Sequence, residues 1–349
     1  MKKLLALMLS LAFIIPSTNT IFASGENNIT RISGGDRYET CVRVNKSLNF
    51  SSDKDSAVIA NGNDFKTALY GSYLSSSLDI PYFISKKDFL SSNVVNELDR
   101  LKIKKVYLLG DNNVLSDKVD NLLKQKSIKT ERIFNKKTDN LFGGYYTDNI
   151  DLQVDGIIHS SLYGNSPRGD ISYAILINDN KFSDLLTTTP FAGALAKSQH
   201  FGLYSFDTLK TTGTEGNTGK IFGYIIGGYD SIPSEFETYD TNWDGSYRGD
   251  KRIHSEDRYK TAIEIANAYK TELNKDIKTV VIVNGDDFAD ALSSGLIASN
   301  NDAAILLTKS DKLNEDTRKY ILENNIKNFI IIGGENSISK DVENELNSL

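Results

Sequence analysis

The feature that most constrains the fold is an internal repeat, because a repeated segment is expected to fold in the same way each time it occurs. Two widely separated stretches share an Asp-Arg-Tyr-x-Thr opening, an Asn-Gly-x-Asp-Phe block and a Gly turn after an apolar run. The three motifs start at Asp36, Asn61 and Gly110 in the first stretch and at Asp257, Asn284 and Gly333 in the last. The shared order and the nearly equal spacing indicate two copies of one folding unit.

A third, weaker copy lies between these two. Asn178 begins a block that reaches Phe182, and Gly227-Gly228 follows an apolar run. The opening of this copy is not recognisable, because Lys136–Asn140 stands where Asp-Arg-Tyr is expected. We therefore place boundaries near Phe134 and Ser246, which give copies at residues 24–133, 134–245 and 246–349.

Each copy alternates short apolar runs with segments of helical periodicity. In the last copy, Val280–Val283, Ala304–Leu307 and Phe329–Ile332 are continuous apolar runs, which is typical of strands buried on both faces. Strands that alternate with helices predict parallel βαβ units. The fold class we expect is α/β, with three tandem doubly wound parallel-sheet repeats of the Rossmann or flavodoxin-like kind.

The N-terminus has the pattern of a secretory signal peptide. Lys2 and Lys3 precede an apolar run that Pro16 ends, and Ala23 offers a small-residue cleavage site. We expect residues 1–23 to be removed and the protein to be secreted to the cell wall or cell surface. The run is too short for a membrane span, and no later stretch is apolar enough for one.

The composition limits the kinds of molecule that the protein is expected to bind. The formal net charge of −6 argues against non-specific binding of nucleic acid. An anionic ligand would need local basic patches, and Lys102–Lys105 and Lys124–Lys137 are either such patches or solvated helix faces. Cys41 is the single cysteine, so no internal disulfide forms, and we expect a buried spectator thiol.

The repeated motifs resemble the clostridial cell-wall-binding repeat type 2 family. The resemblance covers nearly the whole chain after residue 23, and is loose in the middle copy. It implies three repeats packed as a pseudo-threefold trimer. It also implies non-covalent anchoring to an anionic, teichoic-acid-like secondary polymer of the Gram-positive wall, beside S-layer or other surface proteins.

The family motif is Ile-Leu-Leu at the end of a strand. The last copy matches it with Ile305, Leu306 and Leu307, and the first copy has Tyr82, Phe83 and Ile84 there. The middle copy aligns best, though poorly, with Leu203–Ser205. The resemblance implies a role in polymer binding, whereas the composition alone predicts a core strand.

Charged and aromatic residues open the first and last copies. Arg37, Tyr38, Arg258 and Tyr259 come just before a predicted helix. Arginine binds phosphate oxygens in bidentate fashion, which makes these residues candidates for polymer binding. The alternative is structural, with the preceding Asp capping the helix and the Arg paired across a contact between repeats.

Polar residues also follow the predicted strands. Asn61, Asp64, Asn284 and Asp287 lie at the carboxyl ends of strands, where open parallel sheets usually bind ligands. The same residues are typical of turns and helix caps, so they form only a candidate ligand edge.

Signatures of catalysis are missing. The chain has neither His-Glu-x-x-His nor Gly-x-Ser-x-Gly, and Gly213–Lys220 departs from a P-loop at Thr214 and Ile221. We expect no catalytic residue, no cofactor and no metal. The alternatives are a wall-active amidase or glycosidase with a site near Tyr145–Asp170, and an adhesin that uses the divergent middle copy.

Overall fold

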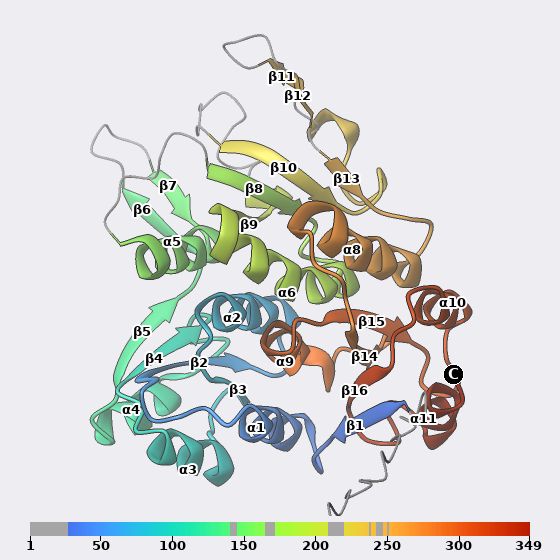
Figure 1. Cartoon of the computed structure of the whole chain (residues 1–349). Coiled ribbons are helices and arrows are strands. Elements are labelled where there is room, and N and C mark those ends of the chain that lie inside the picture. Colours follow the sequence, from blue (N-terminus) through green and yellow to red (C-terminus); the bar gives the residue numbers. More distant parts are fainter. Residues whose placement is uncertain are drawn as a thin grey trace, which may run out of the picture.

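Three four-stranded parallel sheets form the framework of the described chain (Figure 1). The computed structural model describes residues 27–139, 145–164, 172–208, 220–236, 239–241, 247–249 and 251–349, so the predicted signal peptide lies outside it. The first sheet has the order β3 (Tyr82–Ser85), β2 (Ser56–Asn61), β4 (Lys105–Leu109), β5 (Lys129–Ile133). The middle sheet has the order β9 (Gly202–Ser205), β8 (Ser172–Ile177), β10 (Lys220–Ile226), β13 (Lys251–Ile253). The last sheet has the order β15 (Ala304–Thr308), β14 (Thr279–Asn284), β16 (Asn328–Ile332), β1 (Asn28–Ile32).

The equivalent strand orders confirm three α/β units, which we call the first, middle and last units. The apolar runs predicted as strands are buried, because helices cover them; β3 and β15, for example, are buried at every position. Cys41 is also buried, as predicted, and burial raises the pKa of its thiol to about 12.

One helix from each unit packs at the centre (Figure 1). These central helices are α2 (Phe65–Leu78), α6 (Phe182–Gln199) and α9 (Ser294–Asn300), the last preceded by the 3-10 turn η2 (Ala291–Ser293). Small side chains permit a close approach, since a Cβ on Gly295 would lie 2.5 Å from Ser72 Oγ and 2.5 Å from Thr189 Oγ1. This packing confirms the pseudo-threefold arrangement of the units.

β1, β5 and β13 each end in the repeated Arg-Ile pair that opens a copy, and each completes the sheet of another unit, although β5 lies inside the range 24–133 predicted for the first copy. β5 pairs with β4, β13 pairs with β10, and β1 pairs in parallel with β16 at the far end of the chain. The last pairing closes the three units into a ring. Lys251–Ile253 thus belongs to the middle sheet and Asn28–Ile32 to the last sheet, whereas the first sheet lies wholly within residues 24–133.

An arginine in each exchanged strand donates a hydrogen bond to the Gly turn of the sheet that the strand joins. Nη1 of Arg31, Arg132 and Arg252 donates to the carbonyls of Gly333, Gly110 and Gly227 at 2.8, 3.0 and 2.8 Å. The same three glycines have φ values of +116°, +108° and +117°, which other residues rarely adopt. The Gly turns identified in the sequence thus accept the hydrogen bonds that join the exchanged strand to its sheet.

Flanking helices cover the outer faces of the first and last sheets. They are α1 (Arg37–Ser47), α3 (Ser92–Arg100) and α4 (Asp117–Gln125) in the first unit, and α8 (Arg258–Leu273), α10 (Glu315–Glu323) and α11 (Lys340–Asn347) in the last. The middle unit contributes α5 (Ile150–Tyr163), the 3-10 turn η1 (Ser234–Phe236) and the hairpins β6 (Lys136–Asp139)–β7 (Tyr145–Asp148) and β11 (Tyr239–Thr241)–β12 (Tyr247–Gly249). None of the helices in the described ranges is both long and apolar enough to cross a membrane.

Candidate functional site

Each unit has an equivalent place where a helix begins beside the end of an edge strand. The N-caps of α1, α5 and α8 are Asp36, Asn149 and Asp257. The edge strands β3, β9 and β15 share one register, because Ile84, Ser205 and Leu307 pair with the residues that precede the Asn found in all three copies. We call these places the strand-end sites of the three units.

The strand-end site of the first unit joins cationic and aromatic side chains. Arg37 Nη1 donates to the Gly62 carbonyl at 2.7 Å, and the Lys86 ammonium lies 5.8 Å from the centre of the Tyr38 ring. A cavity of about 220 Å³ lies beside them, and its lining includes Asp36, Tyr38, Ile84, Lys86 and Phe89. Burial raises the pKa of Tyr38, so its hydroxyl is a neutral hydrogen-bond donor at neutral pH.

The last unit repeats this arrangement. Arg258 Nη1 donates to the Gly285 carbonyl at 2.5 Å, and the Tyr259 hydroxyl donates to the Asp286 carboxylate at 3.4 Å. Burial also raises the pKa of Tyr259. Lys309 is exposed at the position that corresponds to Lys86.

Three phenylalanines link the sites at the pseudo-threefold axis. The ring centres of Phe65, Phe182 and Phe288 lie 5.5 to 6.3 Å apart, one from the start of each central helix or the turn before it. The guanidinium of Arg37 lies 5.7 Å from the Phe288 ring, and that of Arg258 lies 5.5 Å from the Phe182 ring. Each arginine thus contacts the neighbouring unit through a phenylalanine ring, and the acidic partner of Arg258, Asp286, lies in its own unit.

The Ile-Leu-Leu position is buried in both units that carry it well. Tyr82, Phe83, Ile84, Ile305, Leu306 and Leu307 are each at most 1% exposed. The end of the strand lies near the tyrosine: a Cβ on Gly62 would lie 3.0 Å from the Tyr38 ring and 3.3 Å from Ile84. On Gly285 it would lie 2.9 Å from Tyr259 and 3.3 Å from Leu307.

The candidate ligand edge is engaged in turns and caps. Asn61 Nδ2 donates to the Val114 carbonyl at 2.7 Å, and Asn284 Nδ2 donates to the Ser337 carbonyl at 3.0 Å, so each ties a strand end to the adjacent Gly turn. Asn178 does the same in the middle unit. Asp64 accepts from the amide of Thr67, and Asp287 accepts from that of Ala289.

Some lysines of the two basic segments are paired with acids. Lys105 pairs with Glu131, Lys124 with Asp120 and Lys126 with Asp99, at 2.8 to 2.9 Å. These contacts favour the solvated-face interpretation of both segments.

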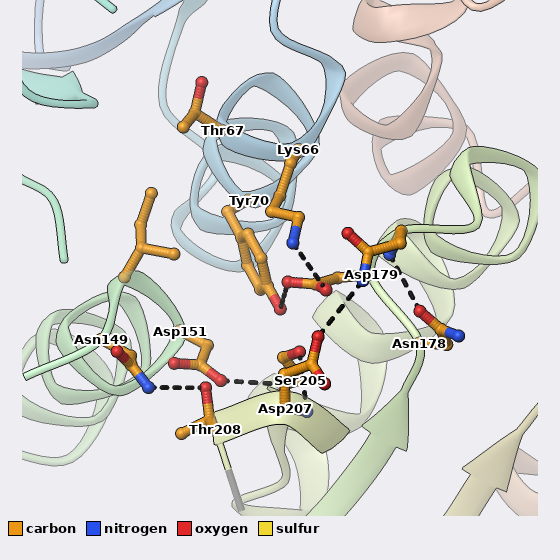
Figure 2. Close-up of polar contacts among 12 residues, drawn as sticks. Lys66, Thr67, Tyr70, Asn149, Asp151, Asn178, Asp179, Ser205, Asp207 and Thr208 are labelled. Carbon is orange, nitrogen blue, oxygen red and sulfur yellow. Dashed lines mark hydrogen bonds and ion pairs between the residues drawn. The ribbon is translucent and has the colours of Figure 1, made fainter. Parts of the chain in front are cut away.

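The strand-end site of the middle unit is different in chemistry (Figure 2). Asp151 accepts from the Ser205 amide at 2.9 Å, and Asp179 pairs with Lys66 of the first unit at 2.9 Å. Asp207 completes a cavity of about 280 Å³ with these residues. Burial raises the pKa of the Asp151 carboxyl to about 6. Within the described residues, no group of three His, Cys, Asp or Glu side chains is arranged to hold a metal ion.

Asp151, Asp179 and Asp207 of this middle site were not predicted from the sequence, and Arg132 was considered only as part of a basic segment. The Arg132-Ile133 pair repeats Arg31-Ile32 and Arg252-Ile253, which is a signal for the missing opening. The helix that should follow directly, α5, begins only at Ile150, because the β6–β7 hairpin intervenes. Asp170, near which a hydrolase site was predicted, lies outside the described residues.

The ring of exchanged α/β units defines a tandem-repeat α/β protein. The chain belongs to the cell wall binding domain 2 (CWB2) family, whose model matches residues 31–120 and 252–343, the first and last copies. Membership places it among cell-wall-binding proteins.

Two curated relatives come from Bacillus subtilis (strain 168). The N-acetylmuramoyl-L-alanine amidase LytC is 24% identical, and the match covers 99% of this chain and 62% of that protein. The amidase enhancer is 23% identical over 90% of this chain and 40% of that protein. The chain thus spans only part of the length of either relative.

Solved structures of two Clostridium difficile proteins share the fold. Cwp8 has a TM-score of 0.69 at 19% identity, with 92% of this chain and 51% of that chain covered. Cwp6 has a TM-score of 0.67 at 20% identity, with 97% and 51% covered.

Proposed function

We propose that this protein is a secreted, non-catalytic surface protein that binds non-covalently to an anionic, teichoic-acid-like polymer of the Gram-positive wall. The observation that carries the proposal is the cationic and aromatic pair at two equivalent strand-end sites. In the first unit, Lys86 lies near the Tyr38 ring beside an open cavity. In the last unit, Lys309 is exposed at the position that corresponds to Lys86.

The chemistry of these side chains suits a phosphate-bearing chain. Lysine and arginine bind phosphate oxygens through charge-assisted hydrogen bonds, while a tyrosine ring offers an apolar surface and a hydroxyl donor. Among the described residues, only Nη1 of Arg37 finds a hydrogen-bond acceptor, so the other guanidinium nitrogens remain available to a ligand. We therefore assign polymer contact to Arg37, Tyr38, Arg258 and Tyr259, and a supporting role to Ile84 and Leu307.

The experiment is co-sedimentation of the protein, from residue 24 onward, with Gram-positive walls before and after acid extraction of the anionic polymer. We expect binding to intact walls, weakened by salt, and loss of binding to extracted walls. Equal binding to both preparations would overturn the proposal, because it would assign the interaction to peptidoglycan.

A pair of double variants tests the sites themselves. Lys86→Glu with Lys309→Glu reverses the charge of both strand-end lysines, and we expect at least a tenfold loss of wall binding. Lys104→Glu with Lys278→Glu makes the same charge change just before β4 and β14, at the opposite ends of the sheets. The control pair is expected to bind within about twofold of wild type, and equal losses in both pairs would argue against the assigned sites.

A wall-active hydrolase is the second candidate function. It is favoured by the similarity to an amidase and by Asp151, whose pKa of about 6 suits a general acid or base. Incubation with purified peptidoglycan tests it: fragments released by wild type and not by Asp151→Asn would support hydrolysis.

A further inference from the structure

A cavity of about 450 Å³ lies between the middle and last units. Residues of the C-terminal parts of α6, α8 and α9 line it, whereas the strand-end sites lie where α1, α5 and α8 begin (Figure 1). Its lining residues all belong to the ranges 172–208 and 251–349 of the described chain. Ligand-binding cavities measure about 300–1,000 Å³, so this one has room for a small molecule.

The cavity is open because two small residues stand where the other contacts between units have large ones. Counted from the phenylalanine that begins each helix, Pro190 in α6 corresponds to Tyr73 in α2, and Ala303 precedes β15 as Phe201 precedes β9. Between the first and middle units, Tyr73 and Phe201 are buried, and the Tyr73 hydroxyl donates to the Phe201 carbonyl at 3.5 Å. Between the last and first units, the corresponding residues are Leu296 and Ile80, which are also buried.

The wall of the cavity carries a buried hydroxyl without a partner. Tyr269 is 3% exposed, and its hydroxyl forms no hydrogen bond with the described residues. Its ring packs against Phe191, with the ring centres 5.2 Å apart. Burial raises the pKa of the hydroxyl, and the Asp302 carboxylate of the same wall raises it further. A buried hydroxyl without a partner destabilises the fold, and a ligand that bonds to it would remove this cost.

The charged side chains of the lining are already in ion pairs. Lys197 Nζ lies 2.6 Å from Asp79, Lys275 Nζ lies 2.8 Å from Asp302, and Glu272 pairs with Lys251. An anionic or cationic ligand would have to break one of these pairs, so the cavity favours a neutral ligand. The rest of the lining combines apolar side chains with uncharged polar ones such as Gln199 and Asn274.

From these observations we infer that the cavity binds a neutral saccharide of one or two rings. A sugar ring has apolar faces of C–H groups, which suit Pro190 and Ala303, and its hydroxyls both donate and accept, as the Tyr269 hydroxyl requires. The inference goes beyond the proposed function, because it concerns an uncharged ligand at a place distinct from the strand-end sites. It makes Tyr269 the residue that contacts the ligand through its hydroxyl.

The test measures binding of three neutral disaccharides, N,N′-diacetylchitobiose, cellobiose and maltose, by saturation-transfer NMR and titration calorimetry. Tyr269→Phe removes only the unpartnered hydroxyl. Tyr320→Phe makes the same change in another largely buried tyrosine, which lies in α10 and does not line this cavity.

We expect wild type to bind at least one of the disaccharides, Tyr269→Phe to bind it about tenfold more weakly, and Tyr320→Phe to stay within about twofold of wild type. Without ligand, Tyr269→Phe should melt no lower than wild type, because the lost hydroxyl had no partner. No binding of any of the three by wild type, or equal affinities of the two variants, would overturn the inference. A lower melting temperature with unchanged binding would also overturn it, since the hydroxyl would then be structural.

A second variant closes the cavity. Ala303→Phe introduces the side chain that Phe201 supplies at the equivalent contact, and we expect a folded protein that no longer binds the disaccharide. A folded Ala303→Phe that binds as tightly as wild type would contradict the location.

The double variant Lys86→Glu with Lys309→Glu separates this inference from the proposed function. We expect it to bind the disaccharide like wild type even though it binds walls weakly. Loss of disaccharide binding in that variant would assign the saccharide to the strand-end sites and overturn the inference.

Discussion

The buried Asp151 carboxyl makes the stability of the protein depend on pH. Burial raises its pKa from 3.8 to about 6, in a pocket it shares with Asp179 and Lys66. The folded state therefore holds the proton more tightly than the unfolded state. The protonated Asp151 carboxyl therefore stabilises the folded state fully below about pH 3.8, and this stabilisation is lost as the pH rises through about 6.

Asp151→Asn removes this titration. The free energy of unfolding of wild type, measured by urea titration, should fall relative to that of the variant by about 2 kcal/mol between pH 4 and pH 7. Other carboxyls with raised pKa values, such as Asp184 and Asp290, contribute equally to both proteins and cancel in the comparison. Parallel pH profiles for the two proteins would contradict the assignment.

Arg132 holds an exchanged strand in place. Its Nη1 donates to the carbonyls of Gly110 and Leu115 at 3.0 and 2.7 Å. Arg132→Ala should lower the free energy of unfolding by about 2–3 kcal/mol, because both buried carbonyls lose a charged donor. Arg318→Ala, at an exposed helix position, should stay within about 0.5 kcal/mol in the same urea titration.

Residues that repeat were predictable, and residues that diverge were not. The Asn and Gly of each block were identified because they recur, although their role as ties between strand and turn needed coordinates. Asp151 and Asp207 replace the recurring residues, so a search for repeats passes over them. The composition of Ile305–Leu307 predicted that these residues are buried, and they are. The resemblance implied that they also take part in polymer binding, and buried side chains can do so only by positioning their neighbours.

At the scale of elements, strand β1 closes the ring. Asn28 donates its amide to Lys327 at 2.8 Å, and Ile32 accepts from the Gly333 amide at 3.0 Å. A chain that begins at Ser33 would leave the edge of β16 unpaired. We expect hydrogen exchange to quicken in β16 while β4 keeps its protection; unchanged exchange in β16 would contradict the pairing.

The central helices depend on small residues at their contact. Gly295→Ala places a methyl group 2.5 Å from Ser72 Oγ and from Thr189 Oγ1, and should cost about 1–3 kcal/mol of unfolding free energy. Gly156→Ala is the matched control in α5, where the new Cβ meets nothing within 4 Å. That change should stabilise the protein slightly, by about 0.5–1 kcal/mol. Equal effects of the two in thermal unfolding would refute the close packing.

Elements were easier to predict than their partners. Buried apolar runs predicted the strands of the last unit, because burial on both faces leaves a continuous pattern. The exchange of β1, β5 and β13 leaves no such pattern in the sequence. Short strands such as Lys251–Ile253 mix polar and apolar residues, and the packing of the three units decides which strands lie next to them. The opening of the middle copy was not recognised because the β6–β7 hairpin is inserted between β5 and α5, so the helix lies further along the chain than in the other copies.

For the whole molecule, the shared core predicts a single unfolding transition. One hydrophobic cluster runs through all three units, while a small second cluster of Leu176, Phe206, Ile225, Ile232 and Phe236 lies in the middle unit alone. Calorimetry should give a ratio of calorimetric to van't Hoff enthalpy near one. Two or three resolved transitions would mean that the units unfold independently.

The exchanged strands also restrict how such a protein can evolve. An open array of repeats can lengthen by duplicating one copy, because each new copy stacks on the last. Here every copy lends its opening strand to another copy, and β1 is lent to the final one. Adding or deleting one copy by recombination would need a new closure with different geometry, so natural variation should accumulate within copies, as the middle one illustrates, rather than in their number.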